Sequence, residues 1–286
     1  MTNKFSRLTA LIACSLAVLF FTPFHLQAAV GDTFIIDQLK YTVLSEDNTA
    51  KTGTVSVVAD SEVQAAIAKG DIFIIDHLKY RYRPKNSTTQ TGTVSVEGEP
   101  KDISGDITIP QTVEKDGYTY SVTVISDWAF GGCMKITSIT IPNGITSIGG
   151  AAFHSCYKLE KVVLPESVTS IEPYAFYRCL SLKNINIPNG ITIINDAAFC
   201  CCWDLEEITI PDSVTEIDVA GFAFCYRLKS IVIPESVTRL GDAAFLDCRS
   251  LTSVQFKGSQ PEMGEKVFIY CDLLNKDFLD SYEKNK

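Results

Sequence analysis

Three adjacent cysteines, Cys200, Cys201 and Cys202, are the side chains of this 286-residue sequence best suited to chemistry. Thiolates bind zinc, form disulfides and act as nucleophiles or redox centres. A zinc site needs four converging Cys or His ligands, and a cysteine nucleophile needs a neighbouring base. The chain has three histidines, of which only His77 and His154 lie beyond the first 28 residues. Whether these cysteines do chemistry therefore depends on the elements that position them.

The cysteines belong to a sequence repeat of 23 residues. Each repeat holds a phenylalanine, a cysteine three residues later and an aliphatic residue after three more. The phenylalanines are Phe130, Phe153, Phe176, Phe199, Phe222, Phe245 and Phe268, and the cysteines are Cys133, Cys156, Cys179, Cys202, Cys225, Cys248 and Cys271. Such a gapless period is typical of a solenoid, in which stacked coils share a core that no single coil could bury.

The repeat decides how the three cysteines are interpreted. Cys202 lies in the repeated column, where a buried thiol acts as a small apolar side chain. Cys200 and Cys201 lie in columns that elsewhere hold residues as different as His154 and Arg178, so neither column is a ligand column. The sequence thus predicts no metal site, no cofactor and mostly free, buried thiols. Disulfides between neighbouring coils are the alternative, and the oxidation state of Cys200 and Cys201 stays open.

Each coil is predicted to contain two short strands. Residues 158–165 alternate apolar side chains with a period of two, and they end at a proline that cannot donate to a sheet. Residues 168–171 form a second extended piece. Residues 23 apart then lie roughly 4.8 Å apart along the axis. A threonine column is expected to hydrogen-bond through its hydroxyl groups. A further column alternates in charge: Glu160, Lys183, Glu206 and Lys229.

The N-terminal third differs from the repeats. Residues 1–28 combine a basic flank, an apolar run and a small-residue site, which indicates a cleaved signal peptide, with lipidation at Cys14 as the alternative. Residues 29–97 hold a duplication, GDTFIIDQLKYTVL (31–44) against GDIFIIDHLKYRYR (70–83), which predicts β-hairpins. The solenoid with its N-terminal cap is assigned to 98–275, and 276–286 to a C-terminal tail.

Composition and motifs exclude several classes of function. The chain carries 25 Lys and Arg against 34 Asp and Glu, a net charge of −9 at pH 7, which argues against binding nucleic acid. No apolar segment of about 18 residues follows the signal peptide, so no transmembrane segment is expected in the mature chain. No catalytic triad, phosphate loop or metalloprotease motif is present, which predicts a protein that is not an enzyme.

The repeat phrase resembles that of the BspA-like bacterial surface leucine-rich repeat proteins. The phrase reads ITSIGGAAFHSCYKLEKVVLPESVTSI over 145–171, and the resemblance covers about residues 105–275. It implies a mostly β, right-handed leucine-rich-repeat solenoid that is exported to the cell surface or periplasm or secreted. It also implies binding to extracellular or host proteins, since some relatives act as adhesins for host matrix proteins. The chain departs from the pattern at Lys257, where a proline is expected.

Two sets of side chains are candidates for binding. Outward strand positions form the first set: Thr140, Lys161, Val163, Asn184, Asn186, Glu207, Thr209, Val232 and Gln255. Aromatic residues after the cysteine column form the second: Tyr157, Trp203 and Tyr226. Exposed rings at regular spacing could anchor a protein or stack on glycans, and the alternative is that they pack over the turn layer. The rival hypothesis for the whole chain is a structural or assembly protein of the cell envelope that polymerises through its N-terminal strands.

Overall fold

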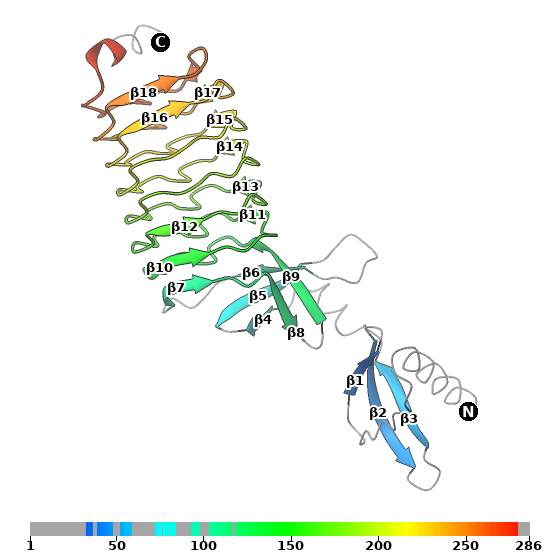
Figure 1. The fold of residues 1–286 in the computed structure, drawn as a ribbon. Helices are drawn as coiled ribbons and strands as arrows, with labels where there is room; N and C mark the ends of the chain where they lie inside the picture. Colours follow the sequence, from blue (N-terminus) through cyan, green and yellow to red (C-terminus); the bar gives the residue numbers. More distant parts are fainter. Residues whose placement is uncertain are drawn as a thin grey trace, which may run out of the picture. The chain divides into compact units, whose positions relative to one another are not determined.

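The structure, a computed structural model, describes residues 33–36, 39–47, 52–58, 72–75, 77–83, 93–97, 103–115 and 118–279 (Figure 1). The predicted signal peptide, Cys14 and residues 280–286 of the predicted tail lie outside the described residues. The chain divides into two units, Met1–Ala66 and Ile67–Lys286. The domain boundaries expected at residues 28, 97 and 275 remain predictions.

Both copies of the N-terminal duplication form three consecutive antiparallel strands. The first copy consists of β1 (Thr33–Ile36), β2 (Leu39–Asp47) and β3 (Thr52–Val58). The second copy consists of β4 (Ile72–Ile75), β5 (Leu78–Arg83) and β6 (Thr93–Val96). The registers are equivalent, since Phe34 lies opposite Tyr41 in the first copy and Phe73 lies opposite Tyr80 in the second.

The second copy is continuous with the first coil of the solenoid. Strand β6 pairs in parallel with β9 (Tyr118–Ile125), which also pairs with the hairpin strand β8 (Thr112–Lys115). The Tyr82 ring lies 4.8 Å from the Phe73 ring and 5.0 Å from the Tyr120 ring, centroid to centroid. These buried rings cover the open end of the repeat core, as a terminal cap must.

The coils that follow build two parallel strand ladders (Figure 1). The first contains β7 (Ser104–Thr108), β10 (Lys135–Thr140), β12 (Lys161–Val163), β16 (Ser230–Ile233) and β18 (Ser253–Phe256), with isolated bridges at Asn184 and Glu207. The second contains β9, β11 (Ser147–Ile148), β13 (Ser170–Ile171), β14 (Ile193–Ile194), β15 (Glu216–Ile217), β17 (Arg239–Leu240) and β19 (Glu262–Met263). Paired residues are 23 apart, except that β7 and β10 pair residues 31 or 32 apart. One helical turn (276–279) follows the last coil. The predicted mostly β repeat solenoid is confirmed.

The phenylalanine column forms the centre of the core. All seven rings are buried, and successive centroids lie 5.1 to 5.5 Å apart with planes within 13° of parallel. This spacing is close to the roughly 4.8 Å between stacked strands, so the rings form one continuous row. Burying each phenylalanine contributes roughly 2–3 kcal/mol. The same residue therefore recurs in every coil.

The turn that carries each phenylalanine uses a left-handed backbone twice. The residue two positions before the ring has φ between 48° and 60°, and the residue two positions after it has φ between 56° and 78°. The N–H groups of alternate turn residues donate to carbonyls of the next coil, as from Phe130 to Ala152 at 2.7 Å and from Phe153 to Ala175 at 2.8 Å. The turns thus add a third ladder of hydrogen bonds between coils.

The threonine column bonds differently from the sequence expectation. The Thr146 hydroxyl donates to the Thr123 carbonyl at 3.2 Å, and the Thr169 hydroxyl donates to the Thr146 carbonyl at 3.3 Å. The expected hydroxyl-to-hydroxyl ladder is wrong, because the carbonyl of the preceding coil lies within reach and is a ready acceptor. Thr146, Thr169, Thr215 and Thr238 each tie their coil to the main chain of the preceding one in this way.

Candidate functional site

The outward strand residues of the first ladder form a surface that we call the strand face. It consists of the nine positions predicted from the sequence, and all nine are exposed. Two of them are apolar, with Val163 55% exposed and Val232 40% exposed. Their neighbours Val162 and Ile231 point inward and are buried, as the period of two predicts.

A groove of about 480 Å³ crosses the N-terminal end of the strand face. Predicted site residues Thr140, Lys161 and Val163 line it, together with Pro142 and Asn143 of the following turn. The parallel pairing of β10 with β12 places Thr140 directly beside Val163. Three of the residues predicted from the sequence thus line one groove, and their role in binding stays a prediction.

One member of the strand face already has partners within the protein. The Asn186 side chain accepts a hydrogen bond from the Leu164 N–H at 3.0 Å and donates one to the Leu164 carbonyl at 2.7 Å. The Asn186 amide thus makes the two hydrogen bonds that a neighbouring strand would make, at a coil where the first ladder has only isolated bridges. Asn186 joins coils, and its neighbour Asn184 is the freer of the two for an external ligand.

The alternating charge column forms ion pairs along the edge of the strand face. Lys183 Nζ lies 2.8 Å from Glu160 Oε2, and Lys229 Nζ lies 2.6 Å from Glu206 Oε2. The Glu206 carboxylate beside Lys229 has its pKa lowered by the hydrogen bond to that ammonium group. These pairs are exposed, so they fix the register of the coils more than they stabilise the fold.

The predicted aromatic residues lie along the turn layer with arginines against two of them. The Arg178 guanidinium carbon lies 5.4 Å from the centroid of the Tyr157 ring, and that of Arg249 lies 4.5 Å from the Tyr226 ring. Trp203 is exposed, and its ring lies 5.5 Å from that of Tyr226. Trp203 and Tyr226 thus contact each other while Trp203 stays exposed, and the binding role of the three aromatic residues stays a prediction.

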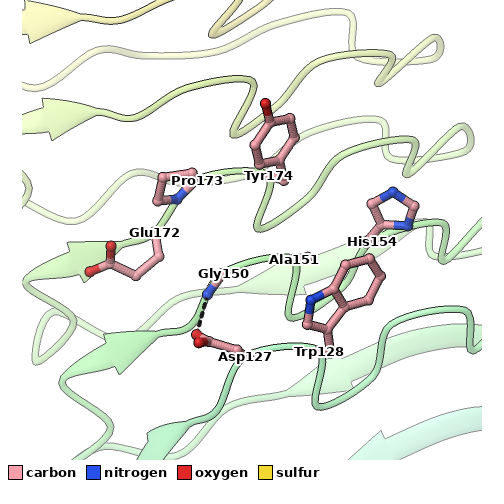
Figure 2. Close-up of a pocket in the computed structure, with 8 residues that line it drawn as sticks. All are labelled: Asp127, Trp128, Gly150, Ala151, His154, Glu172, Pro173 and Tyr174. Atoms are coloured by element: carbon pink, nitrogen blue, oxygen red, sulfur yellow. Dashed lines mark hydrogen bonds between the residues drawn. The ribbon is translucent and has the colours of Figure 1, made fainter.

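A second pocket, of about 650 Å³, was not predicted from the sequence. It is lined by Asp127, Trp128, Gly150, Ala151, His154, Glu172, Pro173 and Tyr174 (Figure 2). It forms where the middle of three consecutive coils carries Gly150 between Asp127 and Pro173, and Ala151 between Trp128 and Tyr174. This local loss of side chains, read column by column, is the signal that could have revealed the pocket.

The cysteine column is buried and serves the fold. The Cys156 thiol donates to the Phe130 carbonyl at 3.1 Å, and the Cys179 thiol donates to the Phe153 carbonyl at 3.2 Å. The same contact recurs from Cys202, Cys225, Cys248 and Cys271. Burial raises the pKa of Cys133 to about 11, so this thiol stays protonated at neutral pH.

Cys200 and Cys201 differ from the column cysteines. Their sulfur atoms lie 3.6 Å apart, and both residues carry free thiols. The hydrogen bond between them raises the pKa of the buried Cys200 and lowers that of the half-buried Cys201. In the described ranges no three His, Cys, Asp or Glu side chains converge so as to hold a metal ion.

The stacked coils, their parallel ladders and the buried phenylalanine row define the class of protein as a leucine-rich-repeat solenoid. The family model described as BspA type leucine rich repeat region matches residues 106–229 and 215–284, with six copies, and the chain belongs to this family. No curated protein matches the chain. Within the described part of the chain, no helix has the length and apolar composition needed to cross a membrane.

Solved structures of bacterial leucine-rich repeat proteins are similar to this one. A leucine-rich repeat protein of T. pallidum is 27% identical, with a TM-score of 0.63 over 72% of this chain and 92% of that one. A leucine-rich cell surface protein of Faecalibacterium prausnitzii is 28% identical, with a TM-score of 0.50 over 66% of this chain and 55% of that one. A protein of Eubacterium ventriosum, 21% identical with a TM-score of 0.56 over 70% of this chain and 50% of that one, shares the fold.

Proposed function

We propose that this protein is exported and binds extracellular or host proteins through the strand face, as an adhesin or a ligand-binding protein without catalytic activity. The observation that carries the proposal is the apolar part of that face. Val163 and Val232 are both exposed on it, although the period of two would place polar residues there. Val163 also lines the groove of the strand face, where it lies beside the polar residues Thr140 and Lys161.

Export is supported by the predicted N-terminal signal peptide and by the similarity to a leucine-rich cell surface protein of Faecalibacterium prausnitzii. Repeat solenoids commonly use such extended faces to bind other proteins. A groove of about 480 Å³ beside Thr140 and Val163 would receive a protruding side chain of the partner. The remaining outward positions would contact its surroundings.

The test is a binding screen against arrayed extracellular matrix proteins, mucins and glycans. The chain from residue 29 is compared with the chain from residue 67, because β6 pairs with β9 and should stay with the solenoid. Saturable binding by both supports the strand face as the binding surface. Absence of binding by both folded proteins contradicts the proposal.

One observation favours assembly as the second candidate function. Strand β4 forms the edge of its sheet among the described strands, and Ile72 and Ile74 are exposed on it. Unpaired edges with apolar side chains invite pairing with another chain. A molecular mass that rises with protein concentration in light scattering would support assembly, and a constant monomer mass would contradict it.

A further inference from the structure

The pocket of about 650 Å³ on the turn layer combines aromatic rings with carboxylates. Trp128 is 60% exposed and Tyr174 is 48% exposed, and they occupy the same column two coils apart. Two coils correspond to roughly 10 Å along the axis, and both residues line the one pocket. Ala151 separates the two rings, and the Gly150–Ala151 backbone lies between them (Figure 2).

The Trp128 ring is held in place by its neighbours. It lies 4.9 Å from the His154 ring, centroid to centroid. A Cβ atom on Gly131 would come within 2.6 Å of the indole, so the ring packs directly over that glycine. The indole is therefore both exposed and ordered, which is what a binding platform requires.

The charge of the pocket comes from two carboxylates without a basic partner. Asp127 accepts a hydrogen bond from the Gly150 N–H at 2.7 Å through Oδ1 only, and Glu172 accepts one from the Ser170 hydroxyl through Oε1. Neither carboxylate forms an ion pair with any residue that the structure describes, and no Lys or Arg lines the pocket. Burial, aided by the nearby Arg178, lowers the pKa of His154, so this ring adds no positive charge at neutral pH.

The protein shows elsewhere what such a combination binds. Arg249 lies over the face of Tyr226, and its guanidinium donates from Nε and NH2 to the two Asp247 oxygens at 2.9 Å each. An aromatic face and a carboxylate together hold a cation there. The pocket at Trp128 presents the same two kinds of group, but no cation of the described chain occupies it.

We propose that this pocket is a binding site for a cationic side chain, a lysine or an arginine, of a partner protein. Aromatic faces attract such cations through their quadrupole, and the free carboxylate oxygens of Asp127 and Glu172 would accept its hydrogen bonds. The inference rests on the proposed protein-binding function and names the partner's chemistry at a second surface. The partner would present a basic segment to this acidic protein.

Close packing of the coils does not require a glycine at position 150. A Cβ atom there would lie 3.6 Å from Asp127 Oδ1 and 3.6 Å from the Pro173 carbonyl oxygen, which are ordinary contacts. A Cβ atom therefore fits at this position, and a side chain that extends from it would occupy space in the pocket that Gly150 lines. This makes Gly150→Leu a variant that blocks the pocket and keeps its charge.

The test uses the fact that the chain has only two tryptophans. In the full chain carrying Trp203→Phe, Trp128 is the single fluorescent indole. This protein is titrated with a capped peptide of alternating arginine and glycine and with the same peptide in which citrulline replaces arginine. We expect a saturable fluorescence change with the arginine peptide and none with the neutral isostere.

Substitutions in and outside the pocket test whether the fluorescence change comes from binding at this site. The double variant Asp127→Asn with Glu172→Gln keeps both accepted hydrogen bonds and removes both charges, so the Kd should rise about tenfold or more. Gly150→Leu should weaken binding similarly, whereas Leu273→Ser, at an exposed position of the last coil outside both proposed surfaces, should leave it unchanged. An equal response to the citrulline peptide, or an unchanged Kd in the double variant, would overturn the site. Either result leaves the strand-face screen unaffected, so the two proposals fail separately.

Discussion

The cysteines of this chain act mainly as core residues with one weak donor. In the repeated column each thiol from Cys156 to Cys271 donates to a phenylalanine carbonyl of the preceding coil, which a purely apolar side chain of the same size could not do. These thiols are buried among close-packed side chains, so a larger residue would have to displace its neighbours. Cys202 therefore has no role as a ligand or a nucleophile in this account. It packs in the core and donates one hydrogen bond.

Cys201 is expected to be the reactive thiol. Its lowered pKa means that the thiolate, and with it the labelling rate, increases at a lower pH than for an ordinary thiol. In the folded protein a water-soluble disulfide reagent at pH 7 should label Cys201 first and the buried column cysteines only after unfolding. Cys200→Ala should slow this phase by roughly three- to tenfold, because it removes the main cause of the lowered pKa. A rapid phase that persists in Cys201→Ser would contradict this assignment.

Of the elements in each coil, the turn that carries the phenylalanine constrains the backbone most strongly. Every turn uses two left-handed positions, and the second ladder and the turn ladder both depend on that conformation. Alanine or a polar residue occupies most of the positions before the phenylalanine, and no β-branched residue occurs at any of them. The reason is that a β-branched side chain clashes with its own main chain at positive φ.

Ala243 tests this demand. It is half-buried with φ 55°, so Ala243→Val should destabilise the fold by about 1–2 kcal/mol. Ala243→Gly adopts the same φ without strain and should change the free energy of unfolding by less. Urea unfolding followed by circular dichroism measures both. Equal stability of the valine and alanine proteins would show that the left-handed turn is not a constraint.

The repeat elements could be predicted from the sequence because they are periodic. The phenylalanine core, the outward Val163 and the pairing of Lys183 with Glu160 all follow from a 23-residue offset. The left-handed turn could not be predicted, since alanine gives no local signal for it. The pocket at Trp128 was also missed, because it arises from a difference between coils, at Gly150, and not from what the coils share.

At the scale of the molecule, the solenoid depends on closure of its first coil. Strands β4 to β6 supply this closure in the second unit, where Tyr80, Val94 and Val96 are buried against β9. The first unit carries an equivalent set of strands, β1 to β3. The duplication thus repeats a module whose second copy has a clear structural role.

Removal of residues 67–97 should therefore weaken the whole solenoid. A chain that begins at residue 98 loses the β6 partner of β9 and exposes Tyr120 and Val122, which are now buried. We expect its Tm to lie at least about 5 °C below that of the chain from residue 67. Differential scanning calorimetry compares the two. Equal Tm values would mean that the second copy is an appendage and not a cap.

The most direct measurement of the central claim compares single substitutions on and off the strand face. Val163→Asp adds a charge to the face, and Val219→Asp adds the same charge to an equally apolar position, 42% exposed, on the turn layer. Binding of each variant to a partner captured in the screen is measured by surface plasmon resonance. The account predicts a Kd at least about tenfold higher for Val163→Asp and an unchanged Kd for Val219→Asp. Unchanged binding of Val163→Asp, or a loss confined to Val219→Asp, would contradict it.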